Sequence, residues 1–259
     1  MKAWLEPLLR SRFLQGAILP LACIALWELV SRQGKVQSYA FVPVREIFGS
    51  LLELLASGTL LLNLLATLQT AASGLLLGGL AGIAVGGLMG ASRLADALIG
   101  PLFHALRQVP ILGWLPLIGL WFGNGDFPRL LIVCLAAFHP LVLNTYEGVR
   151  SIEQRYLEVG AVLRFGRLQR LRYVLLPGAL PSVLTGVMHG LAFSWIATVG
   201  SELLFATGPG LGGLMQTAQA ASRMDVVVIC VAGIGVVGYG MHLGFALLGR
   251  YLLRWRSVR

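Results

Sequence analysis

The sequence predicts an all-α, polytopic membrane protein with about six transmembrane helices, and three observations support this fold class. Of the 259 residues, 57% are hydrophobic and only 12% are charged, whereas soluble globular domains carry about 25% charged residues. Several long stretches contain no Asp, Glu, Lys or Arg, as a helix that crosses a bilayer requires. Basic residues cluster in alternate connecting segments, which is typical of membrane proteins. This composition excludes both an ordinary soluble enzyme and a disordered chain.

Six segments have the length and apolar character of a membrane span. They lie near residues 14–31, 67–90, 99–122, 129–147, 180–204 and 225–249. Pro101, Pro110 and Pro116 predict that the third span is kinked, because proline removes a backbone donor and clashes with the preceding turn. We expect a single transmembrane domain over residues 1–259, with its core over about 62–250.

The distribution of basic residues predicts the orientation of the chain. Lys2, Arg10 and Arg12 precede the first span, and no small-residue cleavage site follows it, which favours a retained signal-anchor helix over residues 1–31. With the N-terminus inside, 14 Lys and Arg residues fall in cytoplasmic segments and 5 in external ones. Both termini are therefore expected in the cytoplasm. The net charge of +9 is then explained by these loops, not by nucleic-acid binding.

A glycine stripe runs through the second span. Gly74, Gly78, Gly82, Gly86 and Gly90 recur at every fourth position, which places them on one helical face. Small residues at this spacing let another helix approach closely within lipid. The stripe predicts helix packing, either in the core of a transport pathway or simply in a well-packed bundle.

The segment between the fourth and fifth spans, from Arg150 to Pro181, is too long for a simple connection. It is rich in arginine, and its apolar residues fall at near-helical spacing. This pattern predicts two short helices at the cytoplasmic surface, separated at Gly166, with Pro177 marking the start of the next span. Two interpretations remain open, an amphipathic hairpin on anionic lipid headgroups or a docking element for a soluble partner.

Within this segment the sequence resembles the inner-membrane permease subunits of bacterial ABC importers, in the branch that serves aliphatic sulfonates, taurine, nitrate and related small anions. The permease motif has Glu-Ala-Ala, a Gly six residues after the Glu, and a Leu-Pro whose Pro lies thirteen residues beyond that Gly. Glu158 takes the first position, with Val159 and Gly160 in place of Ala-Ala, and Leu176 and Pro177 close the motif on spacing.

The chain departs from the motif at its central glycine. Arg164 occupies that position, and Gly166 is expected to supply the flexible turn instead. Residues 150–176 are thus assigned as a coupling loop. The resemblance continues elsewhere, in segments that match the family's span boundaries and its Gly-Leu-Gly loop, namely Phe41 to Pro43, Leu106 to Gly123, Ser201-Glu202 and Gly208 to Leu214.

The resemblance implies a permease in the bacterial inner membrane that forms the pathway for a small solute, expected to be an aliphatic sulfonate or a taurine-like anion. A second copy of the permease completes the pathway, two ABC ATPase subunits dock below, a solute-binding protein delivers substrate, and membrane lipids surround the spans. Nitrate, bicarbonate, a pyrimidine precursor or a vitamin are alternative substrates. A stand-alone secondary transporter or channel is the alternative of a different class.

The chain itself is not expected to be an enzyme or to bind a cofactor. Its only lysines, Lys2 and Lys35, lack the P-loop pattern, so ATP and Mg would be held by a separate ATPase chain. Gly123 to Asp126 matches the Gly-x-Gly-Asp string of intramembrane aspartyl proteases, but Asp126 lies in a short external loop and no second aspartate lies in the middle of a span. The cysteines and histidines have no metal-ligand spacing, which predicts no metal site.

Ionisable groups inside a span are costly and indicate function. His104, Arg107 and Gln108 lie at i, i+3 and i+4 on one helical face. Together with Glu202 they are the candidate pathway or anion-contact residues, because a guanidinium binds oxyanions in a bidentate manner. In the alternative interpretation Arg107 pairs with an acid such as Glu147 or Glu202, or extends its charge to the membrane edge.

Overall fold

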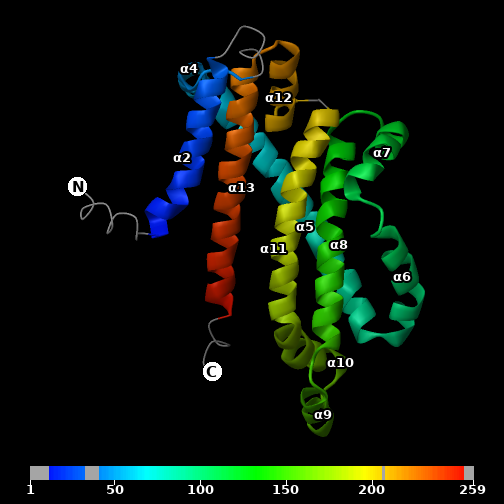
Figure 1. Ribbon diagram of the computed structural model, residues 1–259. Helices are drawn as coiled ribbons and strands as arrows, with labels where there is room; N and C mark the ends of the chain where they lie inside the picture. Colours follow the sequence, from blue (N-terminus) through cyan, green and yellow to red (C-terminus); the bar gives the residue numbers. More distant parts are fainter. Residues whose placement is uncertain (1–11, 33–40, 206–207, 254–259) are drawn as a thin grey trace, which may run out of the picture. The chain divides into compact units, whose positions relative to one another are not determined.

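The computed structural model is built of helices throughout its described residues, which are 12–32, 41–205 and 208–253 (Figure 1). The all-α fold is confirmed, since these ranges contain no strand. Six of the basic residues used to predict the orientation lie outside the described residues, namely Lys2, Arg10, Lys35, Arg254, Arg256 and Arg259. The helices are α2 (Arg12–Ser31), α4 (Val44–Ala56), α5 (Thr59–Ala91), α6 (Arg93–Leu106), η1 (Ile111–Trp114), α7 (Leu115–Phe122), α8 (Asp126–Arg150), α9 (Gln154–Val162), α10 (Arg167–Arg170), η2 (Leu171–Leu175), α11 (Leu176–Leu204), α12 (Leu211–Ala220) and α13 (Met224–Leu252).

The predicted spans coincide with these helices. Within the described ranges, four helices are long and apolar enough to cross a membrane, namely Thr59–Ala91, Asp126–Arg150, Arg167–Leu204 and Met224–Tyr251. A fifth candidate is the pair formed by Arg93–Leu106 and Ile111–Phe122, whose axes are bent by 84°. At the position of the first predicted span, Ile18–Ser31 is a shorter apolar helix.

The predicted kink in the third span is a complete break at Pro110. Proline cannot continue a helix, and it also disfavours the helical conformation at the residue before it, Val109. Pro101 lies within α6, and Pro116 lies in the first turn of α7, where its missing N–H leaves no helical bond unmade. Only one of the three prolines therefore interrupts the span.

The chain divides into two compact units, residues 1–60 with 215–232 and residues 61–214 with 233–259. In the first unit, Trp27 Nε1 donates to the carbonyl of Val42 at 2.9 Å. Glu28, the acidic residue of the first predicted span, accepts a hydrogen bond from the first amide of α4, Val44 N, at 3.0 Å. Glu28 therefore caps a helix in this unit, and this bond fixes the start of α4.

In the second unit α8 lies beside α11, with α6 and α7 along its other side (Figure 1). Fully buried side chains of α8, such as Ile132 and Val142, join two apolar clusters. The first cluster comprises Leu115, Ile118, Ile132, Ala136, Ala197 and Phe205, and the second comprises Met89, Phe103 and Val142. The same helix thus packs against both halves of the broken span and against α11.

The glycine stripe of α5 faces α8. A Cβ atom added at Gly82 would lie 2.8 Å from the carbonyl oxygen of Phe138 and 2.9 Å from Leu141 Cβ. A Cβ at any of the other four stripe positions would also press against α8. The pairs are Gly74 with Val133, Gly78 with Cys134, Gly86 with Val142 and Gly90 with Val149. The two backbones are therefore closer than any side chain would allow, as small-residue stripes permit.

Candidate functional site

The short helix α9 carries the predicted coupling residues and is open to its surroundings. Gly160 is its one buried residue, whereas Glu158 and Val159 are exposed. Tyr156 is 51% exposed and Val162 81% exposed. A nine-residue helix with apolar side chains so exposed gains little from the rest of this chain, so its apolar surface is available to a partner.

The turn after α9 falls at Arg164, not at Gly166 as the sequence predicted. Arg164 has a φ of 51°, a left-handed conformation that favours glycine. Its amide donates to Ala161 O at 3.0 Å, and Phe165 N donates to Gly160 O at 2.9 Å, which is the hydrogen-bond pattern of a Schellman motif. Gly166 has a φ of −64° and begins α10 instead. The motif glycine is thus explained by backbone geometry, which arginine adopts here at some strain.

The second predicted surface helix is continuous with the fifth span. From Arg167 the chain is helical to Leu204, so the prediction of two separate short helices is wrong for the second one. The stretch Leu171–Leu175 has π-helical hydrogen bonds and ends two residues before Pro177. A wider turn there accommodates proline, whose ring would otherwise clash with the carbonyl four residues earlier.

A groove of about 930 Å³ separates α9 from the start of α11. Three of the predicted coupling residues, Val159, Gly160 and Pro177, line it. The other four lie outside it, and all of them are exposed, namely Glu158, Arg164, Gly166 and Leu176. The predicted coupling residues therefore gather at one end of the second unit, around a groove that continues onto an exposed helix.

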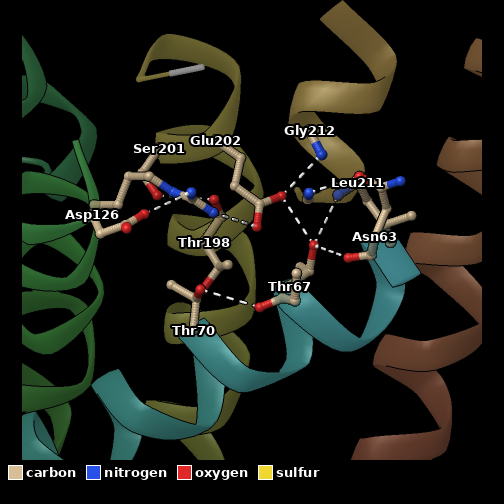
Figure 2. Close-up of polar contacts among 12 residues, drawn as sticks. Asn63, Thr67, Thr70, Asp126, Thr198, Ser201, Glu202, Leu211 and Gly212 are labelled. Atoms are coloured by element: carbon tan, nitrogen blue, oxygen red, sulfur yellow. Dashed lines mark hydrogen bonds and ion pairs between the residues drawn. The ribbon is translucent and has the colours of Figure 1, made fainter. Parts of the chain in front are cut away.

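Glu202 lies elsewhere, at the centre of a closed polar cluster (Figure 2). Its side chain is 1% exposed and that of Arg129 is 5% exposed, with Arg129 Nη2 at 3.1 Å from Glu202 Oε1. The other carboxylate oxygen accepts hydrogen bonds from Thr67 Oγ1 at 3.0 Å and from Gly212 N at 2.9 Å. Every oxygen of this carboxylate therefore has a protein donor, as a buried charge requires.

The first turn of α12 and the residue before it, Gly210, complete this Glu202 cluster, which comprises Asn63, Thr67, Arg129, Glu202 and the amides of residues 210–212. Gly210 N donates to Asn63 Oδ1 at 2.8 Å, and Leu211 N donates to Thr67 Oγ1 at 2.9 Å. A Cβ on Gly210 would lie 2.5 Å from the carboxyl carbon of Glu202. The Gly-Leu-Gly sequence is therefore needed because its backbone approaches a buried carboxylate.

This geometry separates Glu202 from the other candidate pathway residues. The charge count above placed Arg129 among the five external basic residues. In the structure it is buried in α8 and is the partner of Glu202. Among the described residues no carboxylate oxygen lies within 4.0 Å of Arg107. The sequence carried one further signal for the cluster, the polar pair Asn63 and Thr67 at i, i+4 in the first half of a long, mostly apolar helix.

Arg107 and Gln108 instead line a second cavity of about 480 Å³, at the break between α6 and η1. His139 of α8 and His189 of α11 line the same cavity. His104 is half-buried and packs against the ring of Phe103 at 5.4 Å, outside this lining. We call this space the Arg107 cavity.

A helical bundle of spans, a break that lines a cavity and an exposed helix next to a groove together define a membrane transport component. The family described as "Binding-protein-dependent transport system inner membrane component" matches residues 74–255. The chain belongs to this family of inner-membrane permeases.

Relatives and solved structures agree with this assignment. The chain is 33% identical to the putative aliphatic sulfonates transport permease protein SsuC of Bacillus subtilis (strain 168), over 96% of this chain and 90% of that protein. It is 33% identical to the taurine transport system permease protein TauC of Escherichia coli (strain K12), over 98% and 94%. It is 31% identical to the bicarbonate transport system permease protein CmpB of Synechococcus elongatus, over 93% and 91%. The crystal structure of an amino acid ABC transporter with histidines shares the fold, with a TM-score of 0.59 at 18% identity over 80% of this chain and 96% of that one.

Proposed function

We propose that two copies of this permease form the translocation pathway of an ATP-driven importer. Two ABC ATPase subunits would dock on the α9 helices of the two copies. The observation that carries this proposal is the exposure of α9, whose one buried residue is Gly160. The partner ATPases would hold ATP and Mg, and a solute-binding protein would deliver substrate on the opposite side. ATP-driven closure of the ATPases would move α9, and through the helix that begins at Arg167 it would move the spans.

The proposed docking surface combines two kinds of contact. Tyr156 and Val159 offer apolar area beside the groove, while the exposed Glu158 offers a single negative charge. Arginines follow at 164, 167, 170 and 172. We propose that this end of the unit is cytoplasmic, because basic segments are retained on that side, and that both termini are cytoplasmic as well.

We propose a small anion as the transported solute, namely an aliphatic sulfonate or a taurine-like compound. Two relatives, an aliphatic sulfonates permease and a taurine permease, support this class. Bicarbonate is the second candidate, since one relative of comparable coverage is a bicarbonate permease. The separate solute-binding protein would set most of the specificity between these anions.

Purification of the tagged chain from native membranes in mild detergent, followed by mass spectrometry, tests the class. A stoichiometric P-loop ATPase is the expected companion. A homo-oligomer without any ATPase, obtained again in lipid nanodiscs, would favour a stand-alone transporter, and α9 would then be a lipid-surface element.

Glu158→Lys is expected to uncouple ATP hydrolysis from uptake, because the reversed charge would repel basic groups in the ATPase groove. Uptake and ATPase activity of the reconstituted complex are measured together. Glu46→Lys makes the same charge change on an exposed residue of α4, outside the coupling loop, and is expected to leave both activities unchanged. Normal uptake by Glu158→Lys would contradict docking through this residue.

A further inference from the structure

The Arg107 cavity is formed where the third span is broken. Non-helical backbone at membrane depth occurs only where protein buries it or where it lines a water-filled cavity. Here residues 107–110 separate α6 from η1, and the same residues line the cavity. The break therefore places backbone carbonyl groups and two polar side chains, Arg107 and Gln108, at an open space between helices.

The position of Arg107 keeps its guanidinium away from the turn at which α6 begins. It follows the last residue of α6, a helix of 14 residues, which rises about 20 Å at roughly 1.5 Å per residue. An arginine side chain is shorter than this distance, so the guanidinium does not reach the Ala91–Ser92 turn where α6 begins. The charge stays beside the cavity.

The charge of Arg107 has no carboxylate beside it among the described residues that line the cavity. Glu202, an expected partner of Arg107, is held by Arg129. The remaining polar lining offers further donors, the amide of Gln108 and the imidazoles of His139 and His189. The Asn144 amide already donates to the carbonyl of Pro140 at 2.8 Å and belongs to the wall.

We propose that the Arg107 cavity is a contact site for the oxyanion head group of the transported solute. Arg107 would bind two oxygens of a sulfonate in its planar fork, while Gln108, His139 and His189 donate to the third oxygen. A volume of about 480 Å³ suits a small organic anion. The apolar part of the lining, which includes Leu143 and Phe193, suits a short aliphatic tail. This inference rests on the proposed transport function and names the residues that recognise the anion.

The first test needs neither a variant nor transport. Phenylglyoxal, which modifies accessible guanidinium groups, is applied to the purified complex, and modification of each arginine is measured by peptide mass spectrometry. We expect Arg107 and Arg93 to react and the buried Arg129 to stay unmodified. Ethanesulfonate should slow the modification of Arg107 severalfold while sparing Arg93, and the uncharged ethyl methyl sulfone should protect neither. Equal modification of Arg107 with and without ethanesulfonate would overturn the proposal.

The second test measures uptake of radiolabelled taurine by the reconstituted complex. Arg107→Gln is expected to lower the uptake rate about tenfold or more, the loss that follows from removing a charge-assisted contact. The matched control Arg93→Gln removes the same charge from the exposed start of α6 and should transport normally. Wild-type uptake by Arg107→Gln would refute the site. If the wild-type complex takes up no taurine, the proposed substrate fails, and the labelling result still decides whether the cavity binds an anion.

Discussion

Two arginines of the second unit occupy opposite environments. Arg129 begins the buried part of α8, where its side chain is 5% exposed and 3.1 Å from the Glu202 carboxylate. Arg107 follows α6, is exposed, and faces a cavity without a carboxylate among its described lining residues. Both lie in or beside an apolar span, and the sequence analysis singled out Arg107, not Arg129, as the ionisable group inside a span.

The difference between the two arginines indicates different roles, a structural one for Arg129 and ligand recognition for Arg107. A buried charge that is fully paired holds helices together, and here the Glu202 cluster joins α5, α8, α11 and the start of α12. A cation that is kept beside an open space without a protein counter-ion is available to a ligand. Substitutions in the Glu202 cluster are therefore expected to lower stability, whereas substitution of Arg107 is expected to lower transport and leave stability nearly unchanged.

The largest expected effect is the loss of the buried pair in Glu202→Ala. This substitution leaves Arg129 without its buried partner, which typically destabilises a protein by about 3–5 kcal/mol. It also removes the acceptor of Gly212 N and Thr67 Oγ1. Thermal unfolding in detergent should show a large decrease in the melting temperature.

Asp126 supplies the matched control for this prediction. It is 3.3 Å from the same arginine, but its side chain is 93% exposed. Asp126→Ala should therefore change stability little, because exposed ion pairs contribute little. The double variant Arg129→Met with Glu202→Gln removes both charges and keeps an acceptor for the two donors, so it should recover part of the loss. Equal stability of Glu202→Ala and Asp126→Ala would show that the cluster does not hold the fold together.

An intermediate effect on stability is expected at the glycine stripe of α5. This stripe packs against α8, the helix that contributes residues to both the Glu202 cluster and the Arg107 cavity. In Gly82→Ala the new Cβ meets Phe138 O at 2.8 Å and Leu141 Cβ at 2.9 Å, and overpacking of this kind typically costs about 1–3 kcal/mol. Gly87→Ala is the control, since its Cβ would meet only Thr145 at 3.9 Å. There the better helix propensity of alanine should stabilise by up to about 1 kcal/mol. Opposite changes in melting temperature are thus expected, and a stabilised Gly82→Ala would refute close packing of α5 on α8.

Features that depend on neighbouring residues in the chain were predictable from the sequence, whereas features that depend on packing were not. Apolar periodicity and the spacing of charges predicted the helices, because each span is apolar along its own length. The break at Pro110 was predictable as a kink, since proline acts on its own backbone neighbours. The continuity of α10, η2 and α11 through Pro177 was not, because a π-helical turn depends on how that helix packs.

Contacts between distant residues were beyond these patterns. Glu202 lies 73 residues from Arg129 and 135 from Thr67 along the chain, so no local spacing relates them. The Arg107 cavity likewise joins the end of α6 to His139 and His189 on two other helices. The same limit applies to Arg164, where the sequence indicated a departure from a motif and only the backbone showed that this residue forms the left-handed turn.

The smallest expected effect on stability is that of Arg107→Gln, and it sharpens the comparison most. Because Arg107 is exposed and has no ion pair among the described residues, its removal should change the free energy of unfolding by no more than about 0.5 kcal/mol. The same melting-temperature assay that detects Glu202→Ala should therefore not distinguish Arg107→Gln from wild type, although uptake of an anion by the assembled complex falls. A marked loss of stability in Arg107→Gln would mean that Arg107, like Arg129, holds helices together and is not a ligand-binding residue.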